Sequence, residues 1–213
     1  MIEKIAEILI SVIAFLLSVS CHEFSHAFFA HIMGDDTAKR RGRMSLNPMR
    51  HFDIMSLLFF LAFHFGWAKG VPIDERNFKD RKKGMVLSAL AGPVTNVILG
   101  FVSFVIFSLI IEMQFKSELM YNIFYYIAMF LNHMVNINVM LAIFNLLPVP
   151  PLDGSKILLF FLPEKYYFKV LSYDRYMMIV SLILVYVGAL DKIVLNGVNN
   201  LINVFEKIVG VFM

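Results

Sequence analysis

Long apolar segments alternate with short charged loops along this chain. Four of these segments approach or exceed the roughly 20 apolar residues that a helix needs to cross a bilayer. The fourth is the shortest, but Arg175 and Lys192 at its ends can extend toward the membrane surface. The pattern predicts an all-α integral membrane protein with about four transmembrane helices, at residues 8–33, 84–111, 119–147 and 176–190.

Residues 52–67 form a further apolar segment, which is shorter than a full span. It lies between two basic loops, at 35–50 and 74–83, and an excess of Lys and Arg favours the cytoplasmic side for both. A span at 52–67 would force one of these loops outside. We therefore predict a re-entrant or interfacial element that enters and leaves on the cytoplasmic side, which is tolerated if it is buried against protein or a polar cavity.

The remaining loops and the tail complete the predicted topology. The loop at 112–118 carries one basic residue, whereas residues 154–175 carry four, so an even number of spans places both termini outside. The tail at 193–213 alternates apolar and polar residues and is predicted to lie at the interface as an amphipathic helix, with a fifth span as the alternative. We expect one membrane-embedded domain over 1–213, with a core at 8–157 and a C-terminal span and tail at 173–213.

Composition supports a membrane protein and argues against nucleic-acid binding. Hydrophobic residues make up 59% of the 213 residues and charged residues 16%, against about 45–50% and about 25% in soluble domains. The net charge is +3, but the basic residues lie in short loops, where cytoplasmic retention explains them. Cys21 is the single cysteine, so no internal disulfide is expected.

The first span contains the sequence His22-Glu23-Phe24-Ser25-His26. Residues four apart share one face of a helix, so the two histidines can bind one metal ion while Glu23 acts as a base toward water. Ionisable side chains inside a span are costly unless they have a role. The pattern predicts a zinc site within the membrane.

A catalytic zinc site needs a third protein ligand, and Asp153 is the best candidate. It follows three prolines that must break the third span and leave irregular backbone, which survives in a membrane where it lines a cavity or packs on protein. Asp153 could instead cap the helix that starts after it. A different class of membrane zinc protease would use a glutamate, with Glu75 and Glu164 as candidates.

Four motifs in order resemble the site-2 protease family of intramembrane zinc metalloproteases. The resemblance covers residues 22–157, and no PDZ or CBS domain is expected, so the chain resembles a minimal member. Gly70, Ile54 and Ser56 depart from the family pattern in the loops over the cavity. The matching motifs are residues 22–26, residues 42–48 with 65–69, residues 91–96 (Ala-Gly-Pro-Val-Thr-Asn) and residues 145–154.

The resemblance implies one zinc ion per chain, held by His22, His26 and Asp153, with Glu23 activating the attacking water. It also implies that Asn96 contacts substrate or polarises the reacting carbonyl, although an interhelical hydrogen bond is the alternative. Pro93 would kink its helix and expose backbone groups to an extended peptide. The candidate substrate-binding residues are Asn96, Pro93, Gly92 and Asn145, of which Asn145 could instead hold the proline segment. Four other histidines fit no recognised spacing with the pair: His31, His51, His64 and His133.

The predicted function is cleavage of peptide bonds in or near transmembrane segments of other proteins, in regulated proteolysis or in clearance of membrane remnants. The predicted location is the cell membrane, with the site toward the cytoplasm. Membrane lipid and a transmembrane substrate are the expected partners, with control by a separate protein or by substrate supply. The alternatives are a metal transporter or a non-catalytic pseudo-protease that uses the same helix.

Overall fold

Helices make up every regular element that the structure describes. The computed structural model describes residues 2–52, 69–163, 166 and 174–211. Its three long helices are α1 (Ile2–Ile32), α4 (Arg81–Ile111) and α5 (Glu118–Asn145). The shorter elements are α2 (Thr37–Arg40), η1 (Pro48–Arg50), η2 (Glu75–Asn77), α6 (Asp153–Leu159), α8 (Asp174–Tyr186) and α9 (Asp191–Val209).

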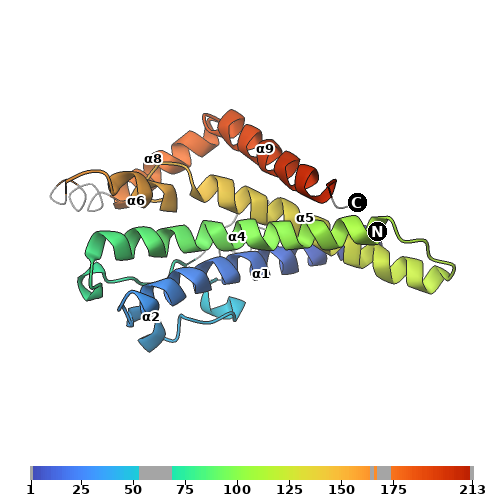
Figure 1. Cartoon of the computed structure of the whole chain (residues 1–213), viewed down its shortest axis with the longest axis horizontal. Coiled ribbons are helices and arrows are strands. Elements are labelled where there is room, and N and C mark those ends of the chain that lie inside the picture. Colours follow the sequence, from blue (N-terminus) through green and yellow to red (C-terminus); the bar gives the residue numbers. More distant parts are fainter. Residues whose placement is uncertain (1, 53–68, 164–165, 167–173, 212–213) are drawn as a thin grey trace.

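The long helices form a bundle in which α4 packs against both α1 and α5. Both chain termini lie at one end of the bundle, and α2 and α6 lie at the other (Figure 1). The three long helices are each long and apolar enough to span a membrane. This confirms the predicted all-helical membrane fold.

A stripe of small residues explains how closely α4 approaches its neighbours. Small side chains let helix backbones come together in a membrane, where burial of apolar surface gives no driving force between helices. Every fourth residue along one face of α4 is small or short and is buried, which places one position per turn against the other helices. These residues are Gly84, Ser88, Gly92, Asn96 and Gly100.

The fourth predicted span, at 176–190, needs correction. The helix α8 ends at Tyr186, and α8 and α9 reach the length and hydropathy of a span only together, as a pair bent by 80°. Gly188 has a positive φ of 69°, a conformation that glycine adopts readily and that turns the chain into α9. The described residues therefore contain three helices long and apolar enough to span a membrane, or four if the bent pair is one span.

The C-terminal helix α9 is amphipathic, but its apolar face covers protein. Phe205 is 3% exposed, and its ring lies 5.2 Å from that of Phe101 and 5.9 Å from that of Phe104 on α4. Gly197 lets α9 come close to Ile143 of α5. The tail is thus held on the bundle by a stripe that the sequence assigned to the membrane interface.

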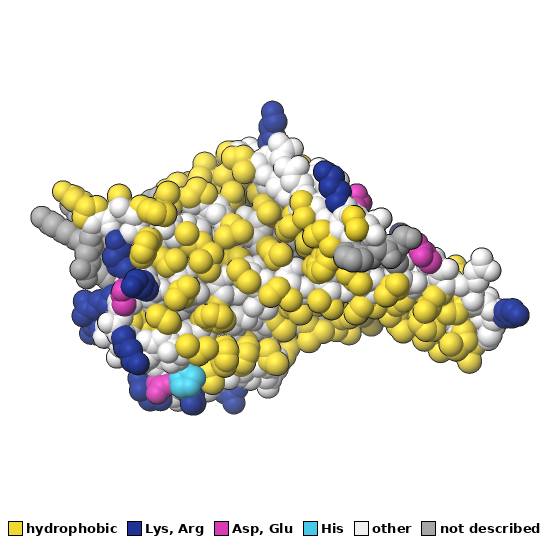
Figure 2. Space-filling model, in the orientation of Figure 1, with side chains coloured by type: hydrophobic (Ala, Val, Ile, Leu, Met, Phe, Trp, Pro, Cys, Tyr) yellow, Lys and Arg dark blue, Asp and Glu magenta, His cyan; other side chains and the backbone are white. Residues whose placement is uncertain are grey.

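Two expectations about the membrane arrangement stay predictions: the re-entrant element at 52–67 and the cytoplasmic placement of the basic loops. The re-entrant element at 52–67 lies, from residue 53 onward, outside the described residues, and so do His64 and Glu164. Most of the Lys and Arg side chains visible in Figure 2 gather at the end of the molecule where α2 and α6 lie. This clustering is what the predicted cytoplasmic placement of that end requires.

Candidate metal centre

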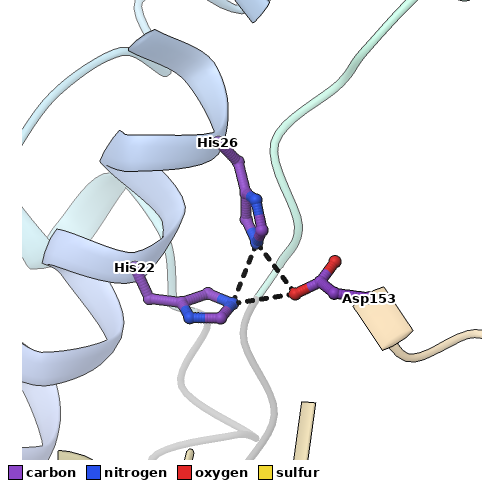
Figure 3. Close-up of side chains that lie close together, drawn as sticks. All are labelled: His22, His26 and Asp153. Atoms are coloured by element: carbon purple, nitrogen blue, oxygen red, sulfur yellow. Dashed lines mark hydrogen bonds and ion pairs between the residues drawn. The ribbon is translucent and has the colours of Figure 1, made fainter. Parts of the chain in front are cut away.

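Two helices bring three metal-ligating side chains together inside the bundle (Figure 3). His22 and His26 lie one turn apart on α1, and Asp153 is the first residue of α6. Asp153 Oδ2 lies 3.3 Å from His22 Nε2 and 3.1 Å from His26 Nε2. The two Nε2 atoms are 2.9 Å apart. Each of the three residues is 6% exposed.

Hydrogen bonds on the far side of each ring determine which nitrogen carries the proton. His22 Nδ1 lies 2.5 Å from Asn96 Oδ1, and His26 Nδ1 lies 2.7 Å from the Ser88 carbonyl oxygen. Both partners are acceptors, so each Nδ1 must donate, and each neutral ring then has an unprotonated Nε2. The lone pairs of two nitrogens and one carboxylate oxygen therefore converge on one point, which suits a cation.

The spacing of these three atoms also fits a metal ion. Ligand bonds of about 2.0–2.1 Å in a tetrahedral zinc site place neighbouring ligand atoms about 3.3 Å apart. The observed separations of 2.9 to 3.3 Å are close to that value. Three protein ligands leave a fourth position open, which is the arrangement of catalytic zinc sites rather than of structural ones.

A network of buried amides orients the His22 ring. Asn138 on α5 donates to the Met134 carbonyl (2.8 Å), so its Oδ1 faces Asn96 and accepts from Asn96 Nδ2 at 2.7 Å. Asn96 Oδ1 is thereby turned toward His22 Nδ1. Ser18 Oγ accepts a second bond from Asn138 at 2.7 Å. Such outer partners orient a ligating imidazole and make it a better ligand.

This network gives Asn96 an interhelical role. Asn96 is fully buried, and both ends of its amide are engaged, by His22 and by Asn138. Its side chain therefore positions a ligand residue from the helix opposite. A contact between Asn96 and substrate stays a prediction.

The Asp153 carboxylate divides its two oxygens between different partners. Oδ2 faces the histidines, and Oδ1 accepts from Lys156 Nζ at 3.2 Å. Leu152, and not Asp153, is the N-cap residue of α6, so the capping alternative is wrong. Because Lys156 engages Oδ1, Asp153 offers the metal position one oxygen.

Glu23 lies beside the cluster and is held by the backbone. Its side chain is buried at 7% exposure, and its Oε2 accepts a hydrogen bond of 2.8 Å from the Val71 amide. Val71 belongs to the irregular segment 69–74 that leads to η2. The bond engages one carboxylate oxygen, and among the described residues no donor engages the other, which can act as a proton acceptor.

The structure also locates the other candidates from the sequence. Gly92 faces the metal position, because a Cβ atom there would lie 2.6 Å from atoms of both histidine rings. The helix α4 continues through Pro93, which is buried. Asn145 ends α5 and donates to the Leu141 carbonyl at 2.9 Å, within its own helix. Substrate contacts of these residues stay predictions.

The alternative ligands do not join the cluster within the described ranges. Among residues 2–52, 69–163, 166 and 174–211, the group of metal-ligating side chains contains His22, His26 and Asp153, and it does not contain Glu75. His31 instead lies 2.5 Å from Asp36. His51 lies 2.6 Å from the Ser45 carbonyl oxygen. The aspartate rather than a described glutamate therefore completes the site.

Sequence reasoning missed Asn138, Ser18 and Lys156. Asn138 carried a usable signal, because an amide inside an apolar span commonly bonds across helices, which is the alternative that the sequence left open for Asn96. Ser18 is one turn before His22, on the same face of α1. Lys156 is three residues after Asp153, which is within reach on a helix.

Comparison with known proteins matches this chain to the model of peptidase family M50 over residues 10–188. The chain belongs to peptidase family M50. This is the site-2 protease family that the motifs indicated, and it makes the chain a metalloprotease. No solved structure matches the chain.

Curated relatives of this M50 chain carry matching descriptions. "Putative zinc metalloprotease YwhC" of Bacillus subtilis is 38% identical over 81% of this chain and 78% of its own length. "Putative zinc metalloprotease MJ0611" of Methanocaldococcus jannaschii is 34% identical over 70% of this chain and 72% of its own length. "Putative zinc metalloprotease Rip2" of Mycolicibacterium smegmatis is 28% identical over 65% of this chain and 52% of its own length.

Proposed function

We propose that this M50 protein is an intramembrane protease that hydrolyses peptide bonds in or near transmembrane segments of other proteins. We also propose that it holds one zinc ion through His22, His26 and Asp153. The observation that carries the proposal is that two of these residues lie on α1, a helix long and apolar enough to span a membrane. A metal centre built into such a helix meets substrates at membrane depth.

The side chains around the site have complementary roles in hydrolysis. Zinc, when bound, polarises a peptide carbonyl and lowers the pKa of water to about 7. The free oxygen of Glu23 accepts the proton of the attacking water and donates it to the leaving amine. Asn96 and the Ser88 carbonyl hold the two rings with their Nε2 atoms toward the metal position.

The membrane location determines what the enzyme requires of its substrate. A helical peptide hides its carbonyls in hydrogen bonds, so it must unwind locally before water can attack. Residues that weaken a helix, such as glycine and proline, therefore favour cleavage. The basic loops support a location in the cell membrane with the site toward the cytoplasm, where those loops contact anionic lipid. Control falls to a separate protein or to the supply of substrate.

Cleavage in reconstituted vesicles tests this proposal. The purified full-length protein is incorporated with a transmembrane segment that carries Gly-Pro at its centre, or with a matched segment that carries Leu-Leu. We expect zinc-dependent cleavage within the apolar segment, faster for the Gly-Pro form, with the cut located by mass spectrometry. Cleavage confined to residues far from the apolar segment would contradict the proposal, and so would zinc flux across the vesicles without any cleavage, which would indicate a transporter.

A further inference from the structure

Asp35 lies just beyond the end of α1 and has no place in the metal centre, yet its side chain is fully buried. Its carboxylate accepts hydrogen bonds from both sides of a loop junction. Oδ1 accepts from the Thr37 amide at 2.9 Å and from Asn77 Nδ2 at 2.8 Å. Oδ2 accepts from the Asp74 amide at 2.7 Å. A single carboxylate thus ties the chain after α1 to the segment before α4.

This tied segment is the one that holds Glu23. Val71, whose amide donates to Glu23 Oε2, lies three residues before Asp74 in the same irregular stretch. Few backbone hydrogen bonds anchor the stretch, because residues 69–74 form no helix or strand. At its start the Lys69 amide donates to the His51 carbonyl oxygen at 2.8 Å, and Arg43 donates to the carbonyl oxygens of the two residues before Val71. Toward its end the stretch depends on side-chain contacts, of which Asp35 supplies those to Asp74 and Asn77.

We propose that Asp35 is a positioning residue for catalysis, which acts through segment 71–77 to hold the Val71 amide against Glu23 and so to aim the free oxygen of Glu23 at the reacting water. This inference rests on the proposed function. Glu23 and Asp35 lie at different heights on one rigid helix and its extension, so the segment is held at two points along α1. Loss of the contacts made by Asp35 would therefore loosen the hydrogen bond between the Val71 amide and Glu23.

The local chain geometry is built for this contact. Gly34 has a φ of 113°, which side chains disfavour, and a Cβ there would lie 3.0 Å from the Asn77 carbonyl oxygen. Burial raises the pKa of the Asp35 carboxyl, but the hydrogen bonds from Thr37, the Asp74 amide and Asn77 outweigh this and lower its pKa below the ordinary value. Asp35 is therefore ionised near neutral pH and accepts from all of its partners.

The test is the isosteric substitution Asp35→Asn in the full-length protein, with Asp36→Asn as the matched control. The asparagine must present an NH₂ group to one of the donors that now face Asp35, so the segment shifts. Asp36 is the next residue, and its carboxylate pairs with His31 instead. We expect kcat to fall at least about tenfold for Asp35→Asn, since small misplacements of catalytic groups are costly, with KM and zinc content within twofold of wild type. Asp36→Asn should leave kcat within twofold.

Amide hydrogen exchange supplies a readout that does not depend on cleavage. Asp35→Asn should speed exchange at Val71, whose amide is protected by Glu23, and leave exchange within α4 unchanged. Asn77→Ala, which removes one link to Asp35 from the other side, should show the same pattern more weakly. Unchanged exchange at Val71, an unchanged kcat, or a loss of kcat that merely follows a loss of zinc would each overturn the inference. If wild type itself fails to cleave, the proposed function fails, and exchange at Val71 still decides whether Asp35 holds the segment.

Discussion

Replacing Asp153 with alanine is expected to weaken zinc binding more than about 100-fold and to abolish cleavage. Loss of an outer partner alone costs about 10–100-fold in metal affinity or activity, and Asp153 is placed to bind the metal directly. The substitution also removes the partner of Lys156, whose Nζ lies 3.2 Å from Asp153 Oδ1. An unpaired positive charge would then face the two histidines and oppose a cation. Zinc content of the purified protein and cleavage in vesicles measure the two effects.

Asp191→Ala is the control for the loss of a negative charge at a helix N-terminus. Asp191 is the first residue of α9, as Asp153 is of α6, and it is exposed. Both substitutions remove a negative charge from a helix N-terminus, which costs about 0.3–1 kcal/mol. Asp191→Ala should keep zinc and activity. Full zinc content in Asp153→Ala would show that another residue is the third ligand.

Gly92→Ala leaves all three metal ligands unchanged, and it is the substitution of this kind that we expect to disrupt the metal centre most. The added Cβ would lie 2.6 Å from His22 Cε1 and from His26 Cε1 and Nε2, too close for any real contact. The rings cannot simply rotate away, because Asn96 and the Ser88 carbonyl hold them. We expect cleavage to fall by about 100-fold, the cost of moving a reacting group by about 1 Å, together with a loss of zinc.

The same helix provides the control for Gly92→Ala. Gly100 lies two turns along α4 on the same small-residue stripe, where a Cβ would meet Val139 Cγ2 at 3.4 Å, close to ordinary contact. Alanine is favoured over glycine in helices by about 1 kcal/mol, so neither substitution should lower thermal stability through backbone propensity. Gly100→Ala should retain zinc and activity. Equal activity in the two variants would mean that α4 does not lie close to the two histidine rings at Gly92.

Local signals in the sequence were enough for the three long helices and for placing His22 and His26 on one helix face, whereas the family resemblance was needed to group Asp153 with them. Hydropathy over long windows predicts spans, and a spacing of four predicts a shared helix face. The proline run predicted that the chain breaks before Asp153. The helices, the histidine pair and the break before Asp153 depend on residues near one another in the chain, so they need no knowledge of packing.

Features that depend on distant contacts were not predictable in this way. The α8–α9 bend arises at Gly188, inside a segment whose hydropathy resembles that of an ordinary span. The apolar stripe of α9 is equally suited to lipid and to protein, and only its packing on α4 and α5 decides between them. Asp35 lies 12 residues and Val71 lies 48 residues after Glu23 in the sequence. A single hydrogen bond joins Val71 to Glu23.

One partly predictable feature is the small-residue stripe of α4. Gly84, Ser88, Gly92, Asn96 and Gly100 repeat at intervals of four, which is a readable sign of close helix packing. Combined with the two histidines on α1, it would have placed Gly92 and Asn96 opposite the metal position. Asn96 would then have been expected as a partner of His22 as well as a substrate contact.

The most direct test compares wild type with Glu23→Gln, with zinc content and cleavage measured on the same vesicle preparations. Glutamine keeps the shape of Glu23 but cannot accept a proton from water. We predict one zinc per chain in both proteins, with cleavage of the transmembrane segment by wild type alone. Cleavage by Glu23→Gln at the wild-type rate, or no cleavage by zinc-loaded wild type, would contradict the proposal.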